Sequence, residues 1–187
     1  MTNDLRIGIK EEDIPRELYR LSDAYLDAAE NLNAQIVNGG WESSYQRGQV
    51  VLFLTFHAIE LCLKGCIKTL LPSATPWGQH KLPKLAQELN ALLPDLDYRV
   101  PFGAVPTPPP EPGLRARMEA HDRELHQQLR YPADNDGKPW EGVFVFSATL
   151  FAGSLREIRD ELVRIRAHVG RRSNGPTPAS SWPTAMI

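Results

Sequence analysis

The sequence predicts an all-α fold, an up-and-down bundle of four to five helices. Apolar residues recur at steps of three and four along several long segments, which is the spacing of one helix face. Prolines and glycines stand at the ends of these segments, where they start or stop helices. No run of residues alternates between apolar and polar as a half-buried strand does. The 187 residues suffice for one domain with a sizeable core.

The first long helix is expected over residues 14–37. Pro15 suits its first turn, where the missing N–H matters least, and Asp13 precedes it as the expected N-cap. The segment 38–40, Asn-Gly-Gly, ends the helix, because glycine accepts the left-handed conformation of a C-cap. Its apolar stripe consists of Ile14, Leu18, Leu21, Tyr25, Ala28, Leu32 and Ile36.

The second long helix, over residues 43–71, is expected to be the central helix of the bundle. Residues 50–71 are mostly apolar, and a helix that is apolar on most sides lies in the middle of a domain. The stretch is long enough to cross a bilayer, but its charged side chains would make a membrane location costly. Gly65 is expected to allow close approach of a neighbour, and Pro72 ends the helix.

A shorter third helix is expected to begin near Pro83 and to end before Pro94. Residues 101–112 carry six prolines, which exclude both a helix and a ladder strand and favour an extended loop. The loop is interpreted as a spacer, with binding by a proline-reading domain as the alternative. A fourth helix is expected near residues 112–130.

The last long helix is expected over residues 142–169, with Gly170 as its cap. The predicted organisation is therefore an N-terminal arm (1–13), a helical bundle (14–170) and a flexible tail (171–187) rich in Ser, Pro and Gly.

Composition excludes several classes of protein. A formal charge of −2 is not that of a polycation that coats nucleic acid. Two cysteines cannot make a disulfide scaffold, and with five scattered histidines they make a zinc module a poor interpretation. The N-terminus has no pattern of a signal peptide. We expect a cytoplasmic protein without a metal or other cofactor.

The sequence contains no nucleotide-binding loop, metalloprotease helix, calcium loop or serine-hydrolase elbow. The polar groups of the central helix are its most informative chemistry. Glu60 and Lys64 are four residues apart in the favourable order for an ion pair, and His57 lies one turn earlier. One interpretation is a structural polar strip; the other is the lining of a groove that binds phosphate or a base. Either way, a charge inside so apolar a helix needs a partner.

Three further groups have two interpretations each. His80 either caps the third helix or reaches back toward Glu60. Cys62 and Cys66 share a helix face, and packing as buried, reduced thiols is favoured over metal binding. On the fourth helix, a set of Arg and His side chains is either a solvated face with local ion pairs or an RNA-binding surface.

Three short motifs, in order, resemble those of the HEPN domain superfamily. The segment 56–65, Phe-His-Ala-Ile-Glu-Leu-Cys-Leu-Lys-Gly, resembles the A-x-E-x-x-x-K helix of that family. The segment 78–85, Gly-Gln-His-Lys-Leu-Pro-Lys-Leu, resembles the H-x-L-x-x-L start of the next helix. The segment 129–132, Leu-Arg-Tyr-Pro, resembles the R-Y-P ending of several branches. The resemblance covers about residues 15–169.

The resemblance implies a bundle of four or five helices that forms a homodimer. Many HEPN proteins are metal-independent ribonucleases with an R-x(4–6)-H motif, and Arg115 and His121 match its spacing here. Ala116 departs from the polar residue usual after that Arg, and the pair follows a proline-rich loop. Other HEPN proteins bind nucleotides or RNA, or pair with nucleotidyltransferase antitoxins. Arg130 and Tyr131 then have a structural or ligand-binding role.

Three hypotheses follow. The first is a non-catalytic module that binds a nucleotide, RNA or a partner protein in a groove formed by His57, Glu60, Lys64, His80, Arg130 and Tyr131. The second is a toxin-like endoribonuclease in which Arg115 stabilises the phosphorane charge and His121 is the general acid or base. The third is a helical oligomerisation scaffold.

Overall fold

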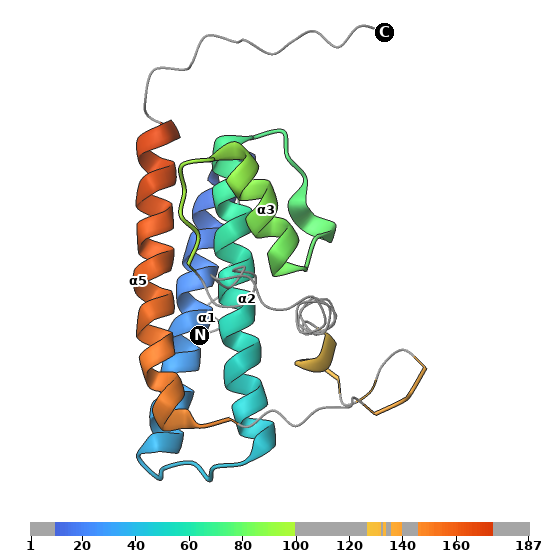
Figure 1. Cartoon of the computed structure of the whole chain (residues 1–187), viewed down its shortest axis with the longest axis vertical. Helices are drawn as coiled ribbons and strands as arrows, with labels where there is room; N and C mark the ends of the chain where they lie inside the picture. Colours follow the sequence, from blue (N-terminus) through green and yellow to red (C-terminus); the bar gives the residue numbers. More distant parts are fainter. Residues whose placement is uncertain (1–9, 100–126, 132, 134–135, 140–145, 174–187) are drawn as a thin grey trace, which may run out of the picture.

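Three long helices form the body of the computed structural model. They are α1 (Ile14–Val37), α2 (Tyr45–Leu70) and α5 (Ala148–Ser173). The structure describes residues 10–99, 127–131, 133, 136–139 and 146–173. α1 packs most extensively against α2, and α5 packs against both. Figure 1 shows the three helices side by side, with α1 running opposite to α2 and α5.

The shorter helix α3 (Leu82–Leu92) packs against α2, and Figure 1 shows it on the side away from α5. Single 3-10 turns, η1 (Glu11–Asp13) and η2 (Pro76–Gly78), precede α1 and α3. Over the described residues the fold is four packed helices without a strand; Ala133 and Pro139 form only an isolated bridge. The predicted all-α bundle is confirmed.

The ends of the first three helices follow from their local sequence. Pro15 lies in the first turn of α1, and Gly39 adopts φ +71° just beyond its end, as expected. Asp13 occupies the N-cap position of α1, but its side chain makes no capping hydrogen bond, because the turn η1 leads directly into the helix. Ser44 caps α2 by accepting a hydrogen bond from the Arg47 N–H at 3.4 Å.

The last helix differs from the predicted range 142–169 at both ends. It begins at Ala148, where the Ser147 hydroxyl accepts a bond from the Leu150 N–H at 3.4 Å and starts the helix. It continues through Gly170 to Ser173, so Gly170 is not its cap, and the first three residues of the predicted tail are helical. Periodicity placed Gly170 at an end, but an exposed helix tolerates a glycine at about 1 kcal/mol.

The core surrounds α2, which is buried on nearly all sides from Thr55 to Lys68. Gly65 has the predicted use, since a Cβ there would lie 2.7 Å from the Tyr19 ring of α1. Polar core contacts join the helices as well: the Ser22 hydroxyl donates to the Ala58 carbonyl at 2.7 Å. The fully buried large side chains are Leu26, Ile59, Leu63, Ile67, Leu82, Leu85, Leu89, Leu93, Leu155, Ile158, Leu162 and Ile165.

By length and composition, α2 passes as a membrane span, alone among the described helices. Two thirds of its most apolar window is buried within the bundle, as in the core helix of a water-soluble domain. Four predictions fall wholly or largely outside the described residues: the N-terminal arm (1–13) up to residue 9, the proline-rich loop 101–112, most of the fourth helix at 112–130, and the chain beyond residue 173.

Candidate functional site

A polar stripe runs along one face of α2. We define it as Phe53, His57, Glu60 and Lys64, which are spaced by four, three and four residues and therefore share a helix face. Glu60 is 1% exposed and Lys64 is 4% exposed, although both are ionisable. Charges this deeply buried need partners, so the contacts of Glu60 organise the site.

One oxygen of the Glu60 carboxylate receives two hydrogen bonds. Lys64 Nζ lies 2.7 Å from Oε1, and His80 Nδ1 lies 3.0 Å from the same atom. Lys64 Nζ also donates to the Trp77 carbonyl at 3.3 Å, which fixes the loop of η2 against α2. The predicted Glu60–Lys64 pair is confirmed. Of the two interpretations of His80, the contact with Glu60 is correct; Lys81 occupies the N-cap of α3, without a side-chain cap.

The other carboxylate oxygen faces His57. Glu60 Oε2 and His57 Nδ1 are 3.7 Å apart, and neither atom has a hydrogen-bond partner among the described residues. The His57 ring lies parallel to the Phe53 ring at 5.9 Å, and its edge contacts Tyr25 of α1 at 4.6 Å. The imidazole is therefore held in place by aromatic packing, with one nitrogen directed at a buried carboxylate.

Arg130 joins the stripe through Phe53. The centre of its guanidinium lies 5.4 Å from the Phe53 ring centroid, which is the geometry of a cation–π contact. Arg130 is exposed, and Tyr131 beside it is 58% exposed. Of the six residues predicted for ligand binding, His57, Lys64 and His80 face the Glu60 carboxylate and Arg130 contacts Phe53, while Tyr131 follows Arg130 in the chain.

The network keeps Glu60 ionised. Burial alone would raise the pKa of its carboxyl group, but His57, Lys64 and His80 together lower this pKa to about 2. The carboxylate therefore carries a fixed negative charge throughout the neutral range, and the Lys64 ammonium ion lies against it.

The other chemical candidates are placed as follows. Arg115 and His121 lie outside the described residues. Cys62 and Cys66 are buried free thiols, as predicted. The hydrogen bond with the neighbouring Cys66 thiol, and after it burial, raise the pKa of Cys62 well above its usual value. No group of three or more His, Cys, Asp or Glu side chains in the described ranges is arranged to hold a metal ion.

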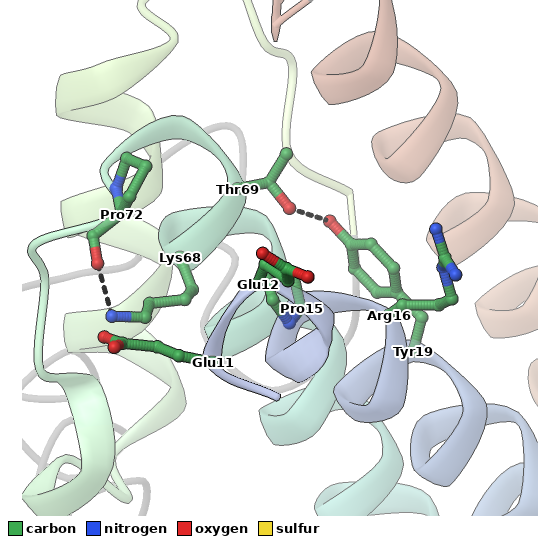
Figure 2. A pocket seen from close by; sticks show the side chains of 8 residues that line it. All are labelled: Glu11, Glu12, Pro15, Arg16, Tyr19, Lys68, Thr69 and Pro72. Carbon is green, nitrogen blue, oxygen red and sulfur yellow. Dashed lines mark hydrogen bonds between the residues drawn. The ribbon is translucent and has the colours of Figure 1, made fainter. Parts of the chain in front are cut away.

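A cavity of about 750 Å³ opens where η1 and the start of α1 meet the end of α2 (Figure 2). The buried Lys68 ammonium donates to the carbonyls of Pro72 and, at 3.2 Å, Ala74, so it holds the chain that leaves α2. The Tyr19 hydroxyl pairs with Thr69 at 3.0 Å. The cavity is lined by Glu11, Glu12, Pro15, Arg16, Tyr19, Lys68, Thr69 and Pro72. The polar groups of this cavity bond to one another and to the chain that leaves α2, which is a structural role. We therefore place the candidate site on the stripe and not in this cavity.

Sequence reasoning missed three contributors to the site. Phe53 precedes His57 by four residues, so the helical spacing that linked His57 to Glu60 also predicts its position on the same face. Tyr25 was assigned to the apolar stripe of α1, and its contact with His57 depends on how α1 packs on α2. Trp77 contributes its backbone carbonyl, which no side-chain pattern reveals. Trp77 itself is 45% exposed, so its side chain gave no signal of a buried contact either.

Comparison with known proteins adds no relative: no family model, no curated protein and no solved structure matches the chain.

Proposed function

We propose that this chain is a HEPN-like binding module without catalysis of its own, and that its ligand is a nucleotide or single-stranded RNA. The observation that carries the proposal is the arrangement of the α2 stripe. A fully buried carboxylate holds Lys64 and His80 at one end, while Arg130 lies over an aromatic ring at the other. The order of the three HEPN-like motifs is an independent reason to expect this use of the same residues.

The exposed groups at the stripe match the chemistry of nucleic acid. Bases stack on aromatic rings and on guanidinium planes, and Arg is the residue best suited to hold a phosphate. Tyr131 is 58% exposed and Arg130 is exposed beside it, so both are accessible to a ligand. The side chain of His80, at the other end of the stripe, is 42% exposed, so part of this polar ring is also accessible.

The buried groups have a positioning role in this proposal. Glu60 accepts from His80 and so fixes the orientation of that ring, while Lys64 neutralises the carboxylate and ties the η2 loop to α2 through the Trp77 carbonyl. A ligand surface held by buried side chains loses less entropy on binding than one made of mobile chains.

The test is fluorescence anisotropy of a labelled single-stranded RNA, in EDTA, with the wild type and the variant Arg130→Gln. We expect binding by the wild type and at least about tenfold weaker binding by the variant, because a guanidinium–phosphate contact contributes about 1.5–3 kcal/mol. The matched control is Arg159→Gln on α5, whose guanidinium is paired with Asp27 and Glu30 of α1 and, over the described residues, forms no hydrogen bond or ion pair with the stripe. Equal affinity for all three proteins would contradict the proposal.

A cleavage assay with the same RNA and one further variant, His121→Ala, separates the module from the enzyme hypothesis. Cleavage of the RNA by the wild type but not by a His121→Ala variant would assign catalysis to the Arg115 and His121 pair and contradict a non-catalytic module. The HEPN-like interpretation also includes a homodimer, with a mass near twice 21.0 kDa by light scattering. A monomer at micromolar concentration would contradict that part.

A further inference from the structure

The chain between α2 and α3 carries an exposed tryptophan next to the stripe. Trp77 lies in the turn η2, and 45% of the residue is exposed. Its backbone carbonyl is bonded to the stripe through Lys64, while its indole makes no ring contact with another aromatic side chain of the described residues. A large flat apolar ring is therefore accessible to solvent where the loop meets the stripe.

Two buried lysines of α2 hold the backbone of this loop in place. Lys64, which is 4% exposed, donates to the Trp77 carbonyl at 3.3 Å. Lys68, which is 7% exposed, donates to the Ala74 carbonyl at 3.2 Å. The Lys64 ammonium is itself fixed at 2.7 Å from the Glu60 carboxylate. Because buried cations keep such partners, the loop has a defined position on α2, and the indole is attached to a fixed backbone.

Trp77 and Arg130 lie at opposite ends of the stripe. Arg130 contacts the ring of Phe53, and the Trp77 backbone is bonded to Lys64. Phe53 and Lys64 are eleven residues apart on one face of α2, which is about 16 Å along the helix axis. In Figure 1, residues 127–131 and the segment between α2 and α3 both lie on the side of α2 away from α5. A ligand that contacts both ends is therefore longer than a single nucleotide.

We infer that Trp77 is a base-stacking residue, so that the stripe takes an oligonucleotide strand with a backbone phosphate at Arg130 and a base on the indole. The inference rests on the proposed function; it adds a second contact and selects an oligonucleotide over a mononucleotide as the ligand. Tryptophan suits this role because its ring is large, flat and apolar, and stacking accepts every base. A residue whose backbone is already fixed also loses less entropy when a ligand covers its ring.

The experiment measures the affinity for a labelled oligouridylate, and for an abasic strand of the same length, by fluorescence anisotropy in EDTA. Every variant at residue 77 keeps the carbonyl that accepts from Lys64, so the substitutions change the ring alone. For Trp77→Leu we expect at least about fivefold weaker binding of oligouridylate, the lower end of what one stacked base supplies, and unchanged binding of the abasic strand. Trp77→Phe should recover part of the loss, since phenylalanine also stacks on bases. The matched control is Arg130→Gln, which should weaken the binding of both strands.

Tryptophan emission gives a readout that a purely structural role would not change. A base stacked on an indole quenches its emission, so unlabelled oligouridylate should quench the wild type more strongly than it quenches Trp77→Phe. The other tryptophans, Trp41, Trp140 and Trp182, are common to both proteins, so the difference reports on residue 77.

The outcomes separate this inference from the proposed function. If Trp77→Leu binds oligouridylate as tightly as the wild type, or loses affinity equally for the abasic strand, the inference is overturned, while weaker binding by Arg130→Gln leaves the binding module standing. Equal quenching of the wild type and Trp77→Phe overturns the inference as well, and this result does not depend on the folding of the leucine variant. Absence of binding by the wild type overturns both.

Discussion

The helices α2 and α5 each have 26 residues and pack side by side, yet the ion pair on α2 is buried and those on α5 lie at the surface. On α2 the carboxylate of Glu60 and the ammonium of Lys64 are buried and pair with each other within the core. On α5 the Arg159 guanidinium reaches across to Asp27 and Glu30 of α1 at the surface. The same kind of ion pair is therefore essential in one helix and accessory in the other, because burial decides what its loss costs.

The largest expected effect comes from the buried pair. Glu60→Gln leaves the Lys64 charge buried without a counter-ion, and we expect a loss of about 3–5 kcal/mol in the free energy of unfolding. Urea denaturation followed by circular dichroism measures it. A loss below about 1 kcal/mol would show that the α2 pair behaves like a surface pair and would remove the contrast with α5.

Acid should expose the same difference. The pKa of Glu60 is about 2 in the folded chain, below its usual value of 4.5, so its contribution to stability is present above pH 4.5 and is lost as the pH falls toward 2. A shift of this size corresponds to about 3 kcal/mol. Unfolding experiments at pH 5 and pH 3 should show a smaller acid loss for Glu60→Gln than for the wild type. Parallel pH profiles for the two proteins would contradict this contribution.

Glycine substitutions compare the packing around the two helices. Gly65→Ala on α2 places a Cβ 2.7 Å from the Tyr19 ring, and we expect a loss of about 1–3 kcal/mol. Gly153→Ala on α5 has no atom within 4 Å of the new Cβ, and we expect a gain of about 0.5–1 kcal/mol from helix propensity. Thermal denaturation of the two variants should therefore shift in opposite directions. Shifts of the same sign would mean that the approach of α1 to α2 is looser than described.

The smallest effect is expected at the surface of α5. Arg159→Gln removes the bonds to Asp27 and Glu30, and we expect a loss below about 1 kcal/mol, which should shrink further in concentrated salt. A loss comparable to that of Glu60→Gln would show that the α1–α5 ion pairs are as important to the fold as the buried pair.

Much of the fold could be predicted because local signals mark the helix ends. Pro15 and Gly39 delimit α1, and Ser44 and Pro72 delimit α2, so their bounds are nearly those expected. The start of α5 could not be found from periodicity, since the apolar pattern continues upstream of Ser147 and only the capping bond marks the true beginning. Gly170 failed as a stop signal, because a glycine with open space around it is tolerated within a helix.

The candidate site was predicted only in part. The i,i+4 spacing of Glu60 and Lys64 is a local property, and the pair forms as expected. The contact of His80 with Glu60 spans twenty residues and depends on how the η2 loop folds back, so the sequence left two interpretations open. The contact of Arg130 with Phe53 joins segments that no periodicity relates.

The most direct test of the account is to map where RNA contacts the chain, using ¹H–¹⁵N NMR spectra of the labelled protein as oligouridylate is added. We predict that the shifted amide signals come from α2 between Phe53 and Lys64, from the segment around His80, and from Arg130 and Tyr131, while the signals of α5 around Arg159 stay unchanged. Shifts concentrated on α5, or none at saturating RNA, would contradict the placement of the binding site on the α2 stripe.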